Sequence, residues 1–260
     1  MRVVVLGGGG RLGKLLAPVF PRPATWLTRQ DIDIRNSDAL RKALTGTQAV
    51  FCMAGVTPGG NAPMEANIDL ARRTLDAAQD VGAGHVFLFS SAAVYGRVSG
   101  VLSEDGPTAP QAPYGVAKLA MEQMAADHEH PNTVLRLGNV AGADAILGGW
   151  KPGFALDVLA DGTTPQRSYI GPACLGRVLS QLCMAFDLPP LMNVAAPGTV
   201  EMGELLDAAH RHWQPKVAGE GTIGQVALDT RVLERFITFD TSDSTAQDIV
   251  ADWRKTTGEQ

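Results

Sequence analysis

The chain has 260 residues, a net charge of −5, and 45% hydrophobic against 19% charged residues. This length suits one large domain or a domain with a smaller appendage, and the composition is that of a globular protein with a sizeable core. The mildly acidic balance and the lack of a basic stripe exclude a nucleic-acid binder that depends on phosphate contacts.

Apolar runs and helical patterns alternate through the first half of the chain. In order, they predict a strand at 3–6, a helix at 10–20, a strand at 24–28, a helix at 37–44, a strand ending near residue 53, a helix at 64–81, a strand at 85–91, a helix at 112–127 and a strand at 133–138. The strands are apolar throughout, which indicates burial on both faces. Strand and helix in turn predict an α/β fold, a Rossmann-type doubly wound parallel sheet.

The pattern loosens after Asn139. A glycine-rich loop is expected at 141–154, followed by helical patterns at 172–186 and 200–213. We therefore assign residues 1–142 to the Rossmann core. Residues 143–260 form a mixed region that contributes later core elements and a small C-terminal substrate-binding region. The last dozen residues are expected to be frayed.

A glycine cluster, "VLGGGGRLG", follows the first predicted strand. Gly8, Gly10 and Gly13 fit the spacing G-x-G-x-x-G, whereas Gly7, Gly10 and Gly13 fit G-x-x-G-x-x-G. Either spacing, between a strand and a helix, leaves backbone N–H groups free where the pyrophosphate of a dinucleotide can approach. The first 142 residues are therefore predicted to bind a dinucleotide.

A second pattern carries candidate catalytic groups. In "PYGVAKLAME", Tyr114 and Lys118 stand four residues apart, on one face of a predicted helix. The ammonium of Lys118 stabilises phenolate, so we expect a lowered pKa for Tyr114. Upstream, "FLFSSAAVYG" ends a strand at Ser90 and Ser91, where ligands bind in open α/β sheets.

Together these stretches resemble a known family. "VLGGGGRLG", "CMAG", "SSAAVYG", "SEDGPTAPQAPYGVAK" and "LRLGNVAG" are similar to the extended short-chain dehydrogenases/reductases, the NAD-dependent epimerase/dehydratase group. The resemblance is close up to about residue 142 and continues faintly through "RSYIG" at 167–171 and "NVAAPGTVEMGELL" from residue 193. It implies the G-x-x-G-x-x-G reading and a homodimer formed through the helices at 64–81 and 112–127.

The resemblance also assigns roles to residues of this chain. The implied catalytic residues are Ser91, Tyr114 and Lys118, and the lysine also binds the nicotinamide ribose. The implied cofactor-binding residues are Gly7, Gly9, Gly10, Arg11, Leu12, Gly13, Arg29, Asp33, Ile34, Met53, Ala54, Gly55, Asn67, Tyr114, Lys118, Leu137 and Val140. The implied substrate-binding residues are Ser91, Asn139 and Arg167, although the acid that follows this arginine in the family is missing here.

The choice of cofactor depends on the end of the second strand. An acidic side chain there would accept hydrogen bonds from the adenosine ribose and repel a 2′-phosphate. This chain has Thr28 and Arg29, with Arg11 in the glycine turn, and guanidinium groups favour a phosphate. Asp31 and Asp33 lie close by and favour the opposite choice. We expect NADP, with NAD as the alternative.

The reaction is less defined than the family. Dehydratases of this group carry an Asp-Glu pair after the catalytic hydroxyl residue, but Ala92 and Ala93 stand here, so a sugar dehydratase is not expected. Two enzyme classes remain: an NADPH-linked carbonyl reductase with Tyr114 as proton donor, or an epimerase that holds NAD tightly. The expected substrate is a nucleotide-sugar-like or other small molecule. A catalytically silent dinucleotide-sensing protein is the alternative outside enzymes.

Cysteine usage and the chain's start bear on its location. Cys52, Cys174 and Cys183 are odd in number and lack metal-ligand spacing, so we expect free thiols and no metal ion. Strand-like residues from Arg2 leave no room for a signal peptide, and no apolar run approaches the roughly 18 residues of a membrane span. The expected location is the cytoplasm, with no membrane partner.

Overall fold

The computed structural model describes residues 1–59 and 62–258. Six parallel strands form its central sheet in the order β11-β6-β4-β3-β1-β2. Their bounds are β1 Val3–Leu6, β2 Thr25–Leu27, β3 Ala49–Cys52, β4 His85–Ser91, β6 Asn132–Leu137 and β11 Leu191–Val194. The Rossmann-type parallel sheet expected from the sequence is confirmed. Strand order reverses at β1 and β3, where ligands bind in such sheets.

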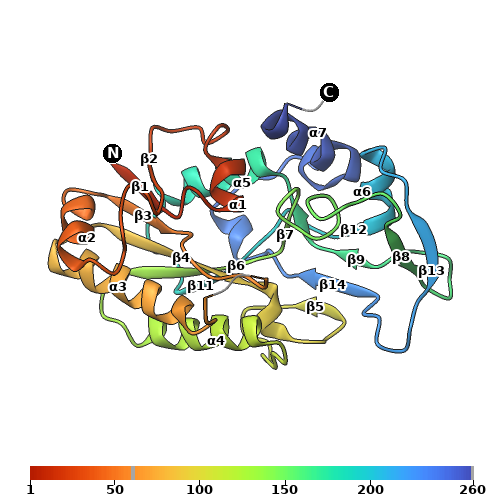
Figure 1. Cartoon of the computed structure of the whole chain (residues 1–260), viewed down its shortest axis with the longest axis horizontal. Helices are drawn as coiled ribbons and strands as arrows, with labels where there is room; N and C mark the ends of the chain where they lie inside the picture. The colour runs from red at the N-terminus through yellow and green to blue at the C-terminus, as the bar shows by residue number, and fades with distance from the viewer. Residues whose placement is uncertain (60–61, 259–260) are drawn as a thin grey trace.

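Helices cover both faces of this sheet (Figure 1). The covering helices are α1 (Arg11–Leu16), α2 (Ser37–Leu44), α3 (Ala66–Asp80), α4 (Pro113–Ala126) and α5 (Pro172–Leu182). Side chains alternate along β1, so that Val3 and Val5 pack toward α1 and α5, while Val4 and Leu6 pack toward α2, α3 and α4. Burial on both faces explains why these strands are apolar throughout.

A smaller lobe, at the right of Figure 1, lies beside the sheet. It contains a four-stranded sheet in the order β12-β9-β14-β5, the strand pairs β8-β13 and β7-β10, and two helices. The bounds are β5 Gly100–Leu102, β7 Asn139–Val140, β8 Ala155–Val158, β9 Gln166–Arg167, β10 Tyr169–Ile170, β12 Val200–Glu201, α6 Met202–Ala208, β13 Gln214–Val217, β14 Gln225–Leu228 and α7 Ala246–Thr257. Three short 3-10 helices complete the described elements: η1 Ala92–Tyr95, η2 Leu233–Arg235 and η3 Thr241–Ser244.

Core and lobe exchange segments of the chain. β5, from the first half, pairs with β14 in the lobe, whereas β11 and α5, from the second half, complete the core. The stretch 188–198, which the sequence pattern treats as a connection between helices, contains the sixth strand. Both halves of the chain therefore contribute to the core and to the lobe.

The chain end is better ordered than expected. The prediction of a frayed last dozen residues is wrong for the described part, because α7 packs Ile249, Val250 and Trp253 into the lobe's apolar cluster. The first helix is shorter than predicted and ends at Leu16, since Pro18 cannot continue a helix.

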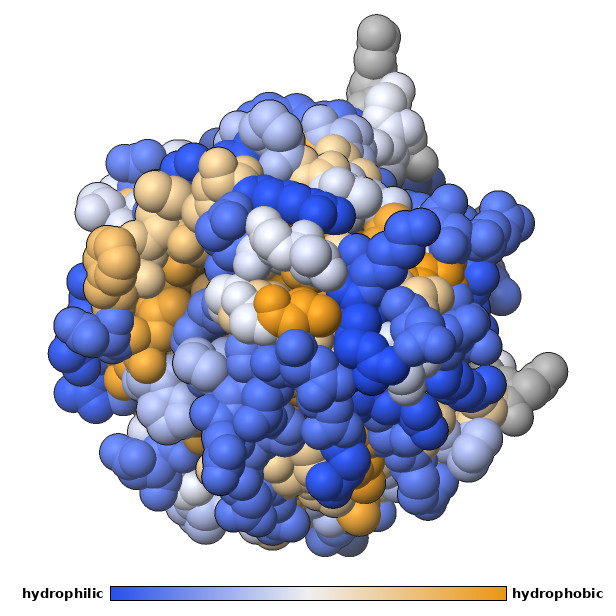
Figure 2. Space-filling view, turned by 90° about the vertical axis from the view of Figure 1, so that its left-hand side faces the viewer, coloured by the Kyte–Doolittle hydropathy of each residue, from blue (hydrophilic) through white to orange (hydrophobic). Residues whose placement is uncertain are grey.

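The surface opposite the lobe faces the viewer in Figure 2. Most of it is hydrophilic; the widest apolar area lies at the left of the view, with smaller apolar areas elsewhere. Among the described residues, no helix combines the length and the apolar character needed to cross a bilayer.

Candidate functional site

The glycine turn after β1 is tightly packed. Gly7 has a φ of +93°, and a Cβ there would lie 2.6 Å from the backbone nitrogen of Ala54. A Cβ on Gly13 would lie 2.6 Å from the carbonyl oxygen of Gly8. The N–H of Gly10 donates to the carbonyl of Gly7 at 3.0 Å and closes the turn. Side chains are therefore excluded at the first and third glycines of the G-x-x-G-x-x-G reading.

The segment after β3 lies directly beside this turn. Asn67, 1% exposed on α3, accepts from the N–H of Val56 and donates to the carbonyls of Val56 and Met64. A Cβ on Gly55 would lie 2.6 Å from the Asn67 side-chain oxygen. The structure therefore gives Asn67 the task of fixing the loop that holds Ala54 and Gly55.

Ser91, Tyr114 and Lys118 approach one another at the carboxyl end of β4. Ser91 ends that strand, and Tyr114 and Lys118 lie on α4, which packs against η1. Gly115 permits this close approach, since a Cβ there would lie 2.6 Å from the carbonyl oxygen of Ala93. Groups far apart in the sequence therefore meet at the sheet edge that carries the glycine turn.

Burial governs the acidity of Tyr114. It raises the pKa of the phenol, and a hydrogen bond with Ser91 lowers it in part. The ammonium of Lys118 lies 5.9 Å from the ring centroid. The lowered pKa expected from the Tyr-x-x-x-Lys spacing is thus wrong in direction for this structure, because desolvation outweighs the hydrogen bond with Ser91.

Lys118 is almost fully enclosed, with 7% of its surface exposed. Its ammonium donates to the carbonyl of Phe89 at 2.7 Å. Burial lowers the pKa of Lys118 to about 8, against the raising effects of Cys52 and Glu122. A Cβ on Gly55 would lie 3.5 Å from the ammonium, so Lys118 borders the loop after β3.

The end of β2 carries an exposed cation and a carboxylate bound by its own loop. The Asp31 carboxylate accepts from the Thr28 hydroxyl at 2.7 Å and from the Thr28 N–H at 2.8 Å, and both bonds lower the pKa of Asp31. Arg29 is exposed between them in the sequence. The carboxylate nearest the strand end is therefore engaged by its own loop.

Two other predicted cofactor residues make contacts elsewhere. The Arg11 guanidinium donates to the Ala143 carbonyl at 3.0 Å, so it reaches the loop after β7 rather than the end of β2. The place of Arg11 beside Arg29 at the adenosine ribose stays a prediction. The Asp33 carboxylate accepts from the N–H of Arg35 at 3.0 Å.

The apolar residues on the predicted cofactor list are mostly packed inward. Ile34 and Val140 are 8% and 5% exposed, and their side chains belong to the core. Leu12, Met53 and Leu137 are partly buried against the same core and border the sheet edge.

Arg167 lies in the lobe, in an open pocket of about 430 Å³ that Arg97, Asp157 and Lys216 also line. Its guanidinium donates to the Gln166 carbonyl at 2.7 Å, and burial lowers the pKa of Arg167. Lys216 and Asp157 stand 3.6 Å apart. The pocket is therefore rich in cations, with one carboxylate among them.

Asn139 connects the sheet edge to the strand that follows Arg167. Its N–H donates to the Ser168 carbonyl at 2.9 Å, and β7 pairs with β10 through Asn139 and Tyr169. The structure thus brings Asn139 next to Ser168, the residue that follows Arg167 of the pocket.

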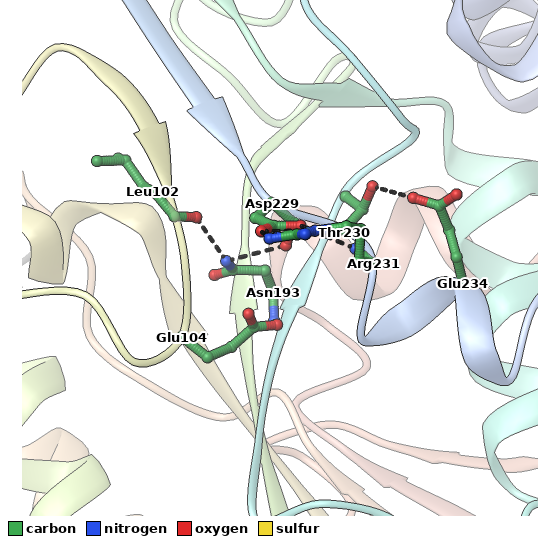
Figure 3. A network of polar contacts seen from close by, with 7 residues as sticks. All are labelled: Leu102, Glu104, Asn193, Asp229, Thr230, Arg231 and Glu234. Carbon is green, nitrogen blue, oxygen red and sulfur yellow. Dashed lines mark hydrogen bonds and ion pairs between the residues drawn. The ribbon is translucent and has the colours of Figure 1, made fainter.

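Asn193 joins core and lobe, and the sequence patterns did not single it out. Its side chain is fully buried and donates to the carbonyls of Leu102 and Asp229 (Figure 3). It also accepts from the Tyr95 hydroxyl at 2.7 Å. Its N–H donates to the Glu104 carboxylate at 2.8 Å. The lone signal was a polar residue within the apolar run "LMNVAA".

Among the described residues, no group of three or more His, Cys, Asp or Glu is arranged to hold a metal ion.

Comparisons with known proteins identify the family of this chain. Residues 3–153 match the model of the NAD dependent epimerase/dehydratase family. The chain is 45% identical over 75 residues to UDP-glucose 4-epimerase of Azospirillum brasilense, covering 27% of this chain and 22% of that protein. It is 29% identical over 180 residues to D-erythronate dehydrogenase of Cupriavidus necator, covering 54% and 56%. The matches thus span less than two thirds of either relative.

Solved structures share the fold over nearly the whole chain. UDP-glucose-4-epimerase of Stenotrophomonas maltophila, with bound NAD and formylated UDP-arabinopyranose, has a TM-score of 0.80 at 18% identity, covering 99% of this chain and 98% of that one. UDP-glucuronic acid 4-epimerase of Bacillus cereus, with NAD, has a TM-score of 0.75 at 18% identity, covering 100% of both. At such identities the likeness concerns the fold alone.

Proposed function

Because the chain belongs to the NAD dependent epimerase/dehydratase family, we propose that it transfers a hydride between a nicotinamide cofactor and a carbon bearing a carbonyl or hydroxyl group. The favoured direction is NADPH-linked carbonyl reduction. The observation that carries the proposal is the approach of Ser91, Tyr114 and Lys118 at the sheet edge that holds the glycine turn.

The residues present fit a dinucleotide. The exclusion of a Cβ at Gly7 and Gly13 keeps the turn bare, so a diphosphate can approach its backbone. The Lys118 ammonium borders the loop after β3 and is available to ribose hydroxyls. When bound, the nicotinamide supplies or accepts the hydride.

Tyr114 is the group that moves the proton. Since burial raises its pKa, the phenol stays protonated near neutral pH and donates its proton to the carbonyl oxygen as that oxygen becomes an alcohol. The Ser91 hydroxyl holds the same oxygen, and the Lys118 ammonium stabilises the phenolate that remains. A protonated donor favours reduction over a reaction that begins with Tyr114 as base.

Elimination of water lacks its acid and base. η1 begins with Ala92 and Ala93 directly after Ser91, and neither side chain can exchange a proton. We therefore favour hydride transfer without dehydration, although dehydratases are among the proteins that share the fold.

The substrate is proposed to be anionic and sugar-derived. The lobe pocket offers Arg97, Arg167 and Lys216, which favour phosphate or carboxylate groups. The relatives act, by their names, on UDP-glucose and on D-erythronate, both of which are anionic.

An epimerase that holds NAD tightly is the second candidate. The 45% identity to UDP-glucose 4-epimerase over 75 residues favours it. In that reaction Tyr114 would first act as base and later return the proton, with no net consumption of cofactor.

Cofactor titration separates these candidates. The purified, cofactor-stripped protein is titrated with NADPH and with NADH while its melting temperature is followed, because a ligand that binds the folded state raises it. We expect a larger rise with NADPH. NAD that cannot be removed without unfolding would support the epimerase, and no rise with either cofactor would overturn the proposal.

Turnover then tests the role of Tyr114. UDP-glucose and D-erythronate, whose hydroxyl-bearing carbons give up a hydride, are supplied with the oxidised cofactors NADP and NAD, and the nicotinamide absorbance and the sugar products are followed. Tyr114→Phe is expected to abolish any turnover while leaving the rise in melting temperature intact. Cofactor binding with no turnover of any carbonyl or alcohol substrate by the unaltered protein would favour a dinucleotide sensor.

A further inference from the structure

A buried ion pair lies directly behind the candidate catalytic residues. Glu122 and Arg136 are 7% and 4% exposed. The Arg136 guanidinium donates to both carboxylate oxygens, at 2.7 Å from Nη2 and 3.1 Å from Nε. The hydroxyl of Ser90, 3% exposed, also donates to the Glu122 carboxylate. All three groups are thus satisfied inside the protein.

The ion pair joins the three elements that carry the site. Ser90 on β4 and Arg136 on β6 are direct partners across the sheet, and Glu122 contacts both from α4. Ser90 immediately precedes Ser91, and Glu122 lies one helical turn after Lys118. The carboxylate therefore fixes the separation between α4 and the sheet at the level of Ser91.

Packing alone does not account for a carboxylate here. The other buried positions of this stretch of α4 are apolar, as at Met121, Met124 and Ala125. A buried ion pair costs desolvation that an apolar pair of similar volume avoids. Glu122 also lies near enough to Lys118 to act on its charge.

We propose that Glu122 is a positioning residue, which sets Tyr114 and Lys118 against Ser91 and keeps the Lys118 ammonium charged. The inference rests on the proposed function, since it concerns the same site. The inference goes beyond the proposed function because it gives a role to Glu122, a buried residue outside the proposed catalytic and cofactor-binding residues.

The charges around Lys118 identify Glu122 as the relevant anion. Burial lowers the pKa of Lys118 to about 8, and Cys52 and Glu122 raise it. Cys52, on β3, is itself buried with a raised pKa, so its thiol is neutral near that pH. Tyr114, with its raised pKa, is neutral there as well. The Glu122 carboxylate is then the negative charge that opposes the loss of the Lys118 proton.

The test measures the titration of Lys118 directly. The six lysines of the chain are labelled with ¹³C at Cε, and their chemical shifts are followed against pH. Lys118→Met identifies the Lys118 signal. In Glu122→Gln we expect Lys118 to lose its proton at a pH lower by about one unit or more. The control, Glu129→Gln, removes an exposed carboxylate just after α4 and should leave the titration unchanged.

A second variant separates positioning from stability. Glu122→Gln leaves the buried Arg136 without its ion pair and lowers the melting temperature. Glu122→Gln combined with Arg136→Met removes that unpaired charge and should regain part of the loss. A purely structural role predicts lower melting temperatures with an unshifted Lys118 titration in both variants, and that result would overturn the inference.

NADPH binding distinguishes this inference from the proposed function. Above the pH at which Lys118 titrates in the variant, but below that of the unaltered protein, Glu122→Gln should bind NADPH at least about tenfold more weakly. If the unaltered protein binds NADPH and the pH at which Lys118 titrates is the same in the variant, the inference is wrong while the proposed function stands. Failure of the unaltered protein to bind either cofactor would sink the proposed function, while the lysine titration still decides the role of Glu122.

Discussion

At the scale of single residues, glycines with the same backbone strain differ in what surrounds them. Gly7 and Gly46 have φ values of +93° and +70°. A Cβ on Gly7 would meet the backbone of Ala54 at 2.6 Å, whereas one on Gly46 would meet nothing within 4 Å. A side chain at Gly46 would therefore suffer backbone strain alone, whereas a side chain at Gly7 would also collide with its surroundings.

This contrast gives a stability prediction. Gly46→Ala should lower the free energy of unfolding by about 1 kcal/mol, the cost of a left-handed non-glycine residue. Gly7→Ala should lower it by about 3 kcal/mol or more, because overpacking adds to the strain. Urea unfolding of both variants measures the difference. Equal losses would mean that the turn relaxes around the added methyl group.

Arg29 decides the expected cofactor preference. Arg29→Ala should weaken NADPH binding about tenfold or more and leave NADH binding nearly unchanged, because the proposed function places its guanidinium against the 2′-phosphate that NADH lacks. Isothermal titration with each cofactor gives the two affinities. Arg35→Ala, at another exposed arginine of the same segment, is the control. Equal weakening of both cofactors would remove Arg29 from the ribose phosphate.

The spacing of residues predicted that Tyr114 and Lys118 lie together, but it did not predict how deeply they are buried. Tyr114 and Lys118 were predicted to share a helix face, and they do. The direction of the Tyr114 pKa shift was wrong because it depends on how deeply other elements cover the phenol. That depth is set by tertiary packing, which a spacing of four residues does not encode.

At the scale of elements, a carboxylate from a distant helix caps the N-terminus of α5. The family acid expected near this helix is absent, and Gly171 and Pro172 begin it instead. The Asp252 carboxylate of α7 accepts from the N–H groups of Ala173 and Cys174, at 3.1 and 2.9 Å. A Cβ on Gly171 would lie 2.1 Å from this carboxylate, so the glycine leaves room for it.

Loss of this cap should loosen the attachment of α7. Asp252→Ala should lower the free energy of unfolding by about 1–2 kcal/mol, the usual cost of a lost N-cap. Asp252→Asn should lose less, because an amide oxygen still accepts from the backbone. Thermal or urea unfolding of both variants tests this. Identical losses in the two variants would show that the carboxylate charge, rather than the accepted hydrogen bonds, matters.

The long core elements could be predicted from the sequence, and the short lobe strands could not. The range 85–91 contains a continuous apolar run, which by itself indicates a buried strand. β9 and β12 contain two residues each and exist through their pairing with each other and with β14. Such strands follow from tertiary contacts, so no local pattern announces them. β11 was missed because Pro189 and Pro190 precede a short run that resembles a connection.

At the scale of the whole molecule, one buried side chain ties the two parts together. Asn193, on β11 of the core, contacts Leu102 beside β14 and the carbonyl of Asp229 just after it. Its side-chain oxygen also accepts a hydrogen bond from the hydroxyl of Tyr95, which lies on η1 next to Ser91. A chain of hydrogen bonds therefore connects the lobe to the segment that follows the candidate catalytic serine.

A buried histidine makes the free energy of unfolding of the whole molecule depend on pH. His85, at the start of β4, is bonded to the Thr133 hydroxyl at 2.9 Å. Burial, with a smaller effect of His130, lowers the pKa of His85 from 6.5 to about 4. The folded protein therefore keeps this imidazole neutral at pH values where the unfolded chain protonates it.

This difference sets the sign of the pH dependence. Above pH 6.5 neither state binds the proton, and the contribution of His85 is constant. As the pH falls from 6.5 toward 4, the unfolded state alone takes up the proton, so the free energy of unfolding decreases. Between pH 7 and pH 5 the decrease should be about 2 kcal/mol. Urea unfolding at a series of pH values measures it, and His85→Gln should remove most of this slope. A slope that persists unchanged in His85→Gln would assign the acid sensitivity to other groups, of which His130, also with a pKa lowered by burial, is the first to test.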